Sequence, residues 1–407
     1  MKQLSEKMLQ MKASSVRKLT KYADAAEAGG KKIYRLNIGQ PDLKVPKEYY
    51  ERVRSFREPT VEYMPSQGIP ELREAVETYY RNIGIDVDRN HIYITTGGTE
   101  AVMFTLLALT NPGDEILIFE PYYSNYNTFF TMTGARPVAV TTCAEDGFHV
   151  EKSAIEEKIT DRTKAIFVTN PGNPTGTVLR KDEVRMIADV AKEHDLYIIC
   201  DEVYREMVFD GREITSFGFL EDIQDRLIMI DSVSKRYNAC GARIGVVISK
   251  NETFLELISK LCQGRLAVST IEQHAAVGLY STGFRVINEV RDEFERRRDV
   301  VYESLMKIPG VFCEKPEGAF YLVCRLPVDD ANDFLIWMLE EFDDRGETVM
   351  AAPADGFYAT EGLGRNEIRI AYVLEPKKLK RAIEILGKGL EAYGKDIGRL
   401  PAAALAQ

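Results

Sequence analysis

Histidine and tryptophan are scarce in this sequence, and cysteine occurs without any close pairing. The 407 residues include four histidines and one tryptophan, and the six cysteines are scattered with no Cys-x-x-Cys pair. Protein zinc sites usually combine closely spaced cysteines and histidines, so we expect no metal centre. Several cysteines lie inside apolar runs, which favours buried, reduced thiols in a cytoplasmic protein.

Long apolar runs and an excess of positive charge are also missing. No run approaches the roughly 18 to 20 apolar residues that span a bilayer, and Met1–Met11 lacks the apolar core of a signal peptide. With 53 basic and 63 acidic residues the net charge is −10. Such a surface repels phosphate backbones, so we expect neither membrane insertion nor nucleic-acid binding. Local arginines can still attract a small anionic substrate.

Short apolar runs alternate with helical patterns through the middle of the chain. The runs are His91–Thr95, Glu115–Phe119, Pro137–Val140, Ala165–Thr169, Leu196–Cys200, Leu227–Ile230 and Gly245–Ile248. Segments such as Thr99–Leu109 and Asp182–His194 between them are typical of helices. Apolar strands separated by helices predict an α/β fold, with a mostly parallel sheet between helices. We expect this large domain to cover residues 47–300.

Beyond about residue 285 the pattern changes to that of a smaller α+β domain. Long helices and apolar strand-like runs follow one another at Val286–Leu305, 318–326, near Asp330–Phe342, 368–374 and Pro376–Tyr393. We expect the smaller domain to comprise residues 301–407. Residues 1–46 should join it, because the two ends of a chain often lie close together.

Two glycine-rich loops follow predicted strands, where open α/β sheets bind their ligands. Thr95–Glu100 (TTGGTE) joins a strand to a helix, and its glycines and free N–H groups suit a phosphate. Asn170–Gly176 (NPGNPTG) predicts a rigid loop from which Asn173 presents its amide to a ligand. Ordinary turn chemistry is the alternative for both loops.

Charged groups mark three further predicted strands. Asp201 follows the run LYIIC, where a carboxylate needs a cationic or N–H partner; a salt bridge or a helix cap is the alternative. Lys235 follows the run LIMI, and beside Arg243 in a dry cleft its ammonium form would be disfavoured, unless it is a solvated surface lysine. Arg369 lies within an apolar strand, which favours a bound carboxylate or phosphate over a structural ion pair.

Together these groups provide what pyridoxal 5'-phosphate requires. A lysine forms a Schiff base with the aldehyde, and an acid keeps the pyridine nitrogen protonated. A glycine-rich helix start with a serine and an arginine holds the phosphate. A second arginine holds the carboxylate of the substrate. The sequence therefore predicts pyridoxal 5'-phosphate as the cofactor.

Along nearly its whole length the chain resembles the class I aminotransferases, of the aspartate aminotransferase fold. The matching motifs occur in family order: NIGQPD (37–42), YMPSQGIPELREA (63–75), TTGGTEA (95–101), PYYSNY (121–126), NPGNPTG (170–176), DEVY (201–204), SVSKRYNACGARIG (232–245), GAFY (318–321) and IRIAYV (368–373). Each motif is modestly specific, whereas the ordered set is highly specific. The resemblance implies a transaminase that alternates between pyridoxal and pyridoxamine phosphate in a ping-pong mechanism, with an amino acid and a 2-oxo acid as substrates.

The resemblance also implies how individual residues meet the coenzyme. Lys235 would form the Schiff base and carry the proton, and Asp201 would pair with the pyridinium nitrogen. Tyr123 would stack on the ring, unless it is an ordinary core tyrosine, whereas Tyr204 and Asn173 would hydrogen-bond the ring hydroxylate. The phosphate would be held by Gly98, Thr99, Ser232 and Arg243, joined by Tyr63 from the neighbouring subunit.

On the substrate side, the resemblance implies that Arg369 clamps the α-carboxylate, helped by the Gly39 backbone and Asn173. The role of Tyr63 implies a homodimer with its sites at the subunit interface. The Pro-Gly expected after a small-domain strand is Pro353-Ala354 here, which puts the shape of the substrate-facing wall in doubt.

The resemblance leaves the substrate open. One aspartate-using branch carries a lysine at the position of Thr99, which this chain lacks. Another branch uses an arginine of the partner subunit from a segment similar to Gln263–Gln273, close to Arg265. On the basis of Arg265 we favour aspartate and glutamate. Broad, aromatic or alanine specificity is the alternative.

Two other functions are compatible with the same motifs. A related lyase, decarboxylase or synthase would keep most of them, because the bond that breaks depends on substrate orientation, which a sequence does not show. A non-enzymatic regulator with a degenerate aminotransferase domain is disfavoured, because the catalytic set is intact.

Overall fold

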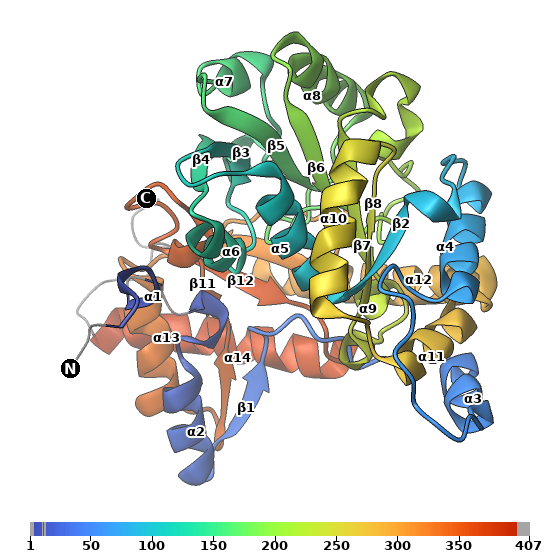
Figure 1. The fold of residues 1–407 in the computed structure, drawn as a ribbon. Coiled ribbons are helices and arrows are strands. Elements are labelled where there is room, and N and C mark those ends of the chain that lie inside the picture. Colours follow the sequence, from blue (N-terminus) through green and yellow to red (C-terminus); the bar gives the residue numbers. More distant parts are fainter. Residues whose placement is uncertain (1–3, 10, 12–13, 397–407) are drawn as a thin grey trace.

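The central feature of the computed structural model, which describes residues 4–9, 11 and 14–396, is a seven-stranded sheet. Its strand order is β2-β8-β7-β6-β5-β3-β4 (Figure 1), and β8 alone runs antiparallel to its neighbours. The strands are β2 (Ile92–Thr96), β3 (Glu115–Glu120), β4 (Arg136–Thr141), β5 (Thr163–Thr169), β6 (Tyr197–Asp201), β7 (Leu227–Ser232) and β8 (Ile244–Ile248). The prediction of a mostly parallel sheet is confirmed, and each predicted run overlaps one strand.

Helices cover both faces of this sheet (Figure 1). They are α4 (Pro70–Asn82), α5 (Gly97–Leu109), α6 (Tyr126–Thr133), α8 (Lys181–Glu193), α10 (Glu252–Arg265) and α11 (Thr270–Tyr280). The core on one face contains α5, α6 and α10 with Ala165 and Phe167, whereas the other contains α4, α8 and α11 with Ile166 and Val168. Burial on both faces explains why the strands read as continuous apolar runs rather than as an alternating pattern.

Segments from both ends of the described chain build a smaller α+β part. One antiparallel sheet has the order β11-β12-β9, and β1 pairs in parallel with β10. The elements are β1 (Lys32–Arg35), β9 (Tyr321–Arg325), β10 (Glu347–Met350), β11 (Ala352–Pro353), β12 (Glu367–Ala371), α2 (Thr20–Ala28), α12 (Gly283–Leu305), α13 (Ala331–Glu340) and α14 (Pro376–Asp396). The fold class is confirmed. The proposed domain limits remain a prediction, and residue 300 falls inside α12.

Short helices and 3-10 turns complete the described chain. They are α1 (Glu6–Leu9), α3 (Lys47–Ser55), α7 (Lys152–Glu156), α9 (Val233–Arg236), η1 (Ser15–Arg17), η2 (Arg89–His91), η3 (Ala144–Asp146), η4 (Phe217–Phe219), η5 (Glu221–Ile223), η6 (Cys240–Ala242) and η7 (Asp355–Phe357). Among the helices that the structure describes, none combines the length and apolarity needed to cross a membrane.

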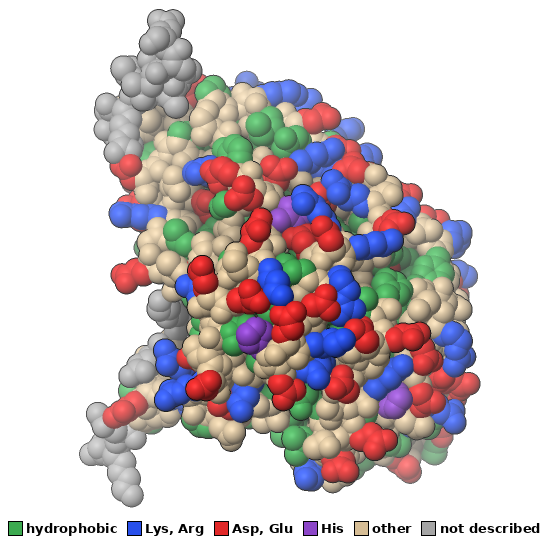
Figure 2. Space-filling view, turned by 90° about the horizontal axis from the view of Figure 1, so that it is seen from above, with side chains coloured by type: hydrophobic (Ala, Val, Ile, Leu, Met, Phe, Trp, Pro, Cys, Tyr) green, Lys and Arg blue, Asp and Glu red, His purple; other side chains and the backbone are tan. Residues whose placement is uncertain are grey.

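Acidic and basic side chains are interspersed over the face of the molecule that Figure 2 shows. Many of the exposed charges form pairs, such as Arg185 with Asp189 at 2.6 Å and Lys192 with Asp222 at 2.6 Å. Pairs in contact with solvent stabilise a fold by only about 0–1 kcal/mol, because water screens both charges.

In contrast to these surface pairs, a cluster of buried ion pairs lies next to the turn that follows β7. Arg205 binds Glu202 at 2.6 Å and Asp231 at 3.1 Å, and Arg236 binds Asp231 at 2.6 Å and Glu206 at 2.7 Å. These five residues are at most 5% exposed. Because Asp231 and Arg236 flank the turn after β7, the cluster fixes its backbone.

Replacing Arg205 with alanine should lower the free energy of unfolding by about 3–5 kcal/mol, because buried carboxylates would lose their cation. Equilibrium unfolding in urea measures the change. The matched control is Arg185→Ala, which removes a partly exposed arginine from ion pairs in contact with solvent and should cost no more than about 1 kcal/mol. Equal losses in the two variants would show that the buried cluster does not contribute as proposed.

Candidate active site

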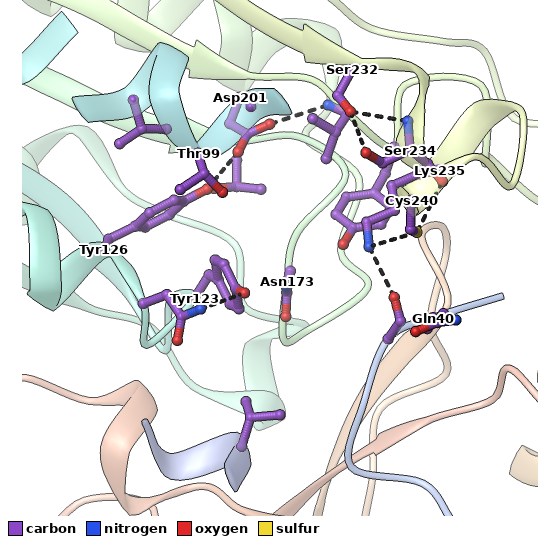
Figure 3. A pocket seen from close by; sticks show the side chains of 18 of the residues that line it. Gln40, Thr99, Tyr123, Tyr126, Asn173, Asp201, Ser232, Ser234, Lys235 and Cys240 are labelled. Carbon is purple, nitrogen blue, oxygen red and sulfur yellow. Dashed lines mark hydrogen bonds between the residues drawn. The ribbon is translucent and has the colours of Figure 1, made fainter. Parts of the chain in front are cut away.

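A cavity of about 290 Å³ lies at the carboxyl ends of the parallel strands (Figure 3). Asp201 ends β6, Ser232 ends β7, and the loop with Asn173 follows β5. The predicted site residues that line this cavity are Gly39, Gly98, Thr99, Tyr123, Asn173, Asp201, Tyr204, Ser232, Lys235, Arg243 and Arg369. The fold thus brings together all of the predicted site residues except Tyr63 and Arg265.

Lys235 reaches the cavity from the single turn of α9. Ser232 caps this turn, since its hydroxyl oxygen accepts a hydrogen bond from the Ser234 N–H at 2.9 Å. The Lys235 Nζ donates to the Gly39 carbonyl at 2.9 Å and lies 3.9 Å from the Cys240 Sγ (Figure 3). The amine is therefore held between the segment that follows β1 and the turn that follows α9.

The charge of Lys235 differs from the expectation. Burial alone lowers the pKa of Lys235, but the ionisable groups around it, chiefly Tyr321 and Cys240, outweigh burial and raise the pKa above its ordinary value. The positive charge of Arg369 opposes this rise. The prediction that the ammonium form of Lys235 is disfavoured is therefore wrong, because the surrounding protein groups stabilise that form.

Asp201 is a buried acid without an ion-pair partner among the described residues. Its carboxylate accepts hydrogen bonds from the Tyr126 hydroxyl at 2.7 Å and the Val203 N–H at 3.2 Å (Figure 3). Burial raises the pKa of Asp201 to about 6, although both hydrogen bonds oppose this shift. A cation placed against Asp201 would therefore gain a strong partner.

The start of α5 meets Ser232 and Arg243. Gly97 has a φ of +74°, a backbone conformation that favours glycine, and it lies beside the Arg243 guanidinium, since a Cβ there would be 2.5 Å from Nη2. A Cβ on Gly98 would come within 4.0 Å of the Ser232 Cβ. Free N–H groups of a helix start, a hydroxyl and a guanidinium together suit a phosphate.

Arg369 of β12 is 1% exposed and forms no ion pair with any described residue. Its Nη1 donates to the Asn173 Oδ1 at 3.1 Å and its Nη2 to the Asn37 carbonyl at 2.5 Å, while its Nε has no hydrogen-bond partner. The guanidinium carbon lies 4.5 Å from the centre of the Tyr321 ring. An unneutralised arginine that lines a cavity is a site for a carboxylate.

Tyrosines form a further part of the wall. The Tyr204 hydroxyl donates to that of Tyr321 at 3.1 Å, and Tyr123 packs edge-on against Tyr126. Tyr126, which hydrogen-bonds Asp201, was not among the predicted site residues. Its motif PYYSNY gave a sufficient signal, but only Tyr123 was assigned from it.

Tyr63 and Arg265 lie away from the cavity of their own chain. Tyr63 is 81% exposed, as expected of a residue that would serve another subunit. Arg265 is held by its own chain: Nη1 lies 3.3 Å from the Glu100 carboxylate, and Nη2 donates to the carbonyls of Ser66 at 3.1 Å and Ile94 at 3.3 Å. A second carboxylate would have to compete with Glu100 for this arginine.

Comparisons with known proteins agree with this geometry. The model of the class I and II aminotransferase family matches residues 31–386. The chain is 34% identical over 385 residues (94% of this chain, 98% of the other) to a (5-formylfuran-3-yl)methyl phosphate transaminase of Methanocaldococcus jannaschii. It is 28% identical over 400 residues (96% and 99%) to an aspartate aminotransferase of Bacillus subtilis. An alanine aminotransferase structure from Pyrococcus furiosus superposes with a TM-score of 0.88 at 30% identity, covering 96% of this chain and all of the other.

The chain belongs to the class I and II aminotransferase family. It is an enzyme, an aminotransferase that moves amino groups between amino acids and 2-oxo acids, and this family generally depends on pyridoxal 5'-phosphate. The resemblance to class I aminotransferases inferred from the motifs is confirmed.

Proposed function

We propose that this aminotransferase binds pyridoxal 5'-phosphate in the cavity and transfers amino groups from α-amino acids, with aspartate and glutamate favoured, to 2-oxo acids. One observation carries the proposal: a single cavity contains the Lys235 amine, the buried Asp201 carboxylate and the unpaired Arg369 guanidinium.

The lining residues fit this coenzyme. The start of α5, Ser232 and Arg243 match a phosphate, and Asp201 matches a cationic ring nitrogen because it has hydrogen bonds but no ion pair. Tyr123 offers a ring face for stacking. The unpartnered Nε of Arg369 is available to the α-carboxylate of a substrate.

When bound, pyridoxal 5'-phosphate supplies an aldehyde that takes up the amino group and a ring that accepts electrons. The Lys235 Nζ would take the proton from the substrate Cα. Asp201 would keep a proton on the ring nitrogen. Tyr204 and Asn173 would donate hydrogen bonds to the ring hydroxylate. Arg369 orients the substrate through its α-carboxylate, with the Gly39 backbone beside it.

We also propose a homodimer in the cytoplasm. The exposure of Tyr63 supports a role in the site of the partner subunit, where its hydroxyl would reach the phosphate. The dimer is inferred from the family resemblance, and the location from the six cysteines, which are all free thiols.

Two alternatives concern the substrate and the bond that breaks. Relatives carry names for different donors, aspartate and alanine among them. The pairing of Arg265 with Glu100 leaves this arginine less available to a dicarboxylate. The charge of the cavity supports dicarboxylates: among the described lining residues Asp201 is the only acid, whereas Lys235, Arg243, Arg369 and Arg17 are basic. A lyase or synthase would use much of the same lining.

A titration of the purified protein with single amino acids, without any oxo acid, tests the proposal. The coenzyme absorbance should change to that of pyridoxamine phosphate while an equal amount of 2-oxo acid is released. A spectrum that no donor changes, or a different product, would favour a lyase or synthase. A protein that takes up no coenzyme would refute the central claim.

A further inference from the structure

One cation of the cavity, Arg17, has no role in the mechanism above. It ends the 3-10 turn η1, lines the same cavity as Arg369 and has an exposed side chain. No described residue forms a hydrogen bond or an ion pair with its guanidinium. Asp201 is the only acid among the described residues that line the cavity, so Arg17 is free to bind an anion there.

Hydrogen bonds and close packing fix the position of the turn that carries Arg17. The Asn37 side chain donates to the Val16 carbonyl at 2.8 Å, and the Asn37 carbonyl accepts the hydrogen bond from the Arg369 Nη2. Ser15 packs so closely on Gly356 that a Cβ there would collide with the Ser15 hydroxyl. Asn37 therefore links the turn directly to the arginine that would bind the α-carboxylate.

The charge of Arg17 reaches the interior of the cavity. Burial raises the pKa of Tyr123, whereas the positive charges of Lys235, Arg369 and Arg17 oppose that rise. The Tyr123 hydroxyl lies beside Asn125, whose side-chain amide donates to it at 2.8 Å, and the Ser14 hydroxyl donates to the Asn125 Oδ1 at 3.0 Å. Arg17 is thus placed near polar groups on the cavity wall.

We propose that Arg17 determines the preference for dicarboxylate substrates by binding their distal carboxylate while Arg369 binds the α-carboxylate. This inference rests on the proposed function, because it assigns a residue to the same site. The distal carboxylate was expected to bind an arginine of the partner subunit at the position of Arg265. Here it would bind Arg17, which belongs to the same chain as Arg369. Arg265 is engaged by Glu100 and two carbonyls, whereas Arg17 has none of these partners.

The test compares Arg17→Ala with Arg265→Ala and with Lys18→Ala, using the full-length protein loaded with coenzyme. Lys18 is the matched control, because it follows Arg17 but pairs with Asp355 at 3.1 Å and does not line the cavity. Calorimetry gives the dissociation constants of maleate, a dicarboxylate that donates no amino group, and of propionate. The kcat/KM for aspartate and for alanine provides a second readout.

Arg17→Ala should weaken maleate binding and lower kcat/KM for aspartate by about tenfold or more, and leave propionate and alanine within about twofold. Lys18→Ala should change neither. Equal losses for aspartate and alanine, or a selective loss in Arg265→Ala but not in Arg17→Ala, would overturn the inference while the aminotransferase function stands. Wild-type protein that converts no donor would overturn both.

Discussion

Replacing Lys235 with alanine should lower the rate of the first half-reaction by about 10⁴-fold or more. The variant loses both the nucleophilic amine and the group that moves the α-proton, and general acid–base catalysis alone accounts for about 10²–10⁴. The rate is measured as the change in coenzyme absorbance after rapid mixing with one amino acid. Among the residues that the structure describes, Lys235 is the only lysine that lines the cavity, so no described neighbour offers a second amine.

Two further measurements separate chemistry from a structural role of Lys235. Lys235→Arg keeps the charge but hardly ever gives up a proton, so it should be about as slow as the alanine variant. Small primary amines added to Lys235→Ala should restore part of the rate, because they can act as the missing base. Near-normal turnover of Lys235→Arg would contradict the proton-transfer role.

Asp201→Asn should lower turnover by about 10³-fold, close to the cost of removing one fixed electrostatic contact to a transition state. An asparagine keeps the shape and the hydrogen bond from Tyr126 but cannot hold a proton on the ring nitrogen. Single-turnover kinetics with a good donor gives the size of the loss. The coenzyme should still bind through the phosphate contacts, so the effect should be on kcat more than on coenzyme content.

The pH dependence of coenzyme affinity provides the control for Asp201. With a pKa of about 6 in the protein alone, the carboxyl becomes protonated as the pH falls through 6 and loses its attraction for a cationic ring. The affinity of the wild-type protein should therefore decrease below pH 6 by more than that of Asp201→Asn. Identical profiles for the two proteins would contradict a pairing of Asp201 with the ring nitrogen.

The large sheet and most of the cavity were predictable from the sequence for a physical reason. Strands buried on both faces are continuous apolar runs, and their carboxyl ends meet at one edge of the sheet. Polar residues directly after such runs, such as Asp201 and Asn173, must therefore converge. No tertiary information beyond the order of strands and helices is needed for that step.

Contacts that depend on distant parts of the chain could not be predicted in this way. β1 and β10 are four residues each, and neither has an apolar run or an alternating pattern long enough to mark a strand. Glu100, the partner of Arg265, lies far away in the sequence. Asn37 anchors the turn of Arg17 across the intervening α2 and β1. The pKa of Lys235 likewise depends on Tyr321, which only the folded chain brings near.

The parallel pairing of β1 with β10 affects the order in which this chain folds during synthesis. Lys32 pairs with Glu347, so β1 leaves the ribosome long before its partner strand exists. The seven-stranded sheet, which is complete once β8 has emerged, can form while β1 is still unpaired. Arg17 precedes β1 and Gly39 follows it, so both residues would reach the cavity only in the last stage of folding. A nascent chain would thus gain its coenzyme-binding sheet early and its substrate-binding wall late.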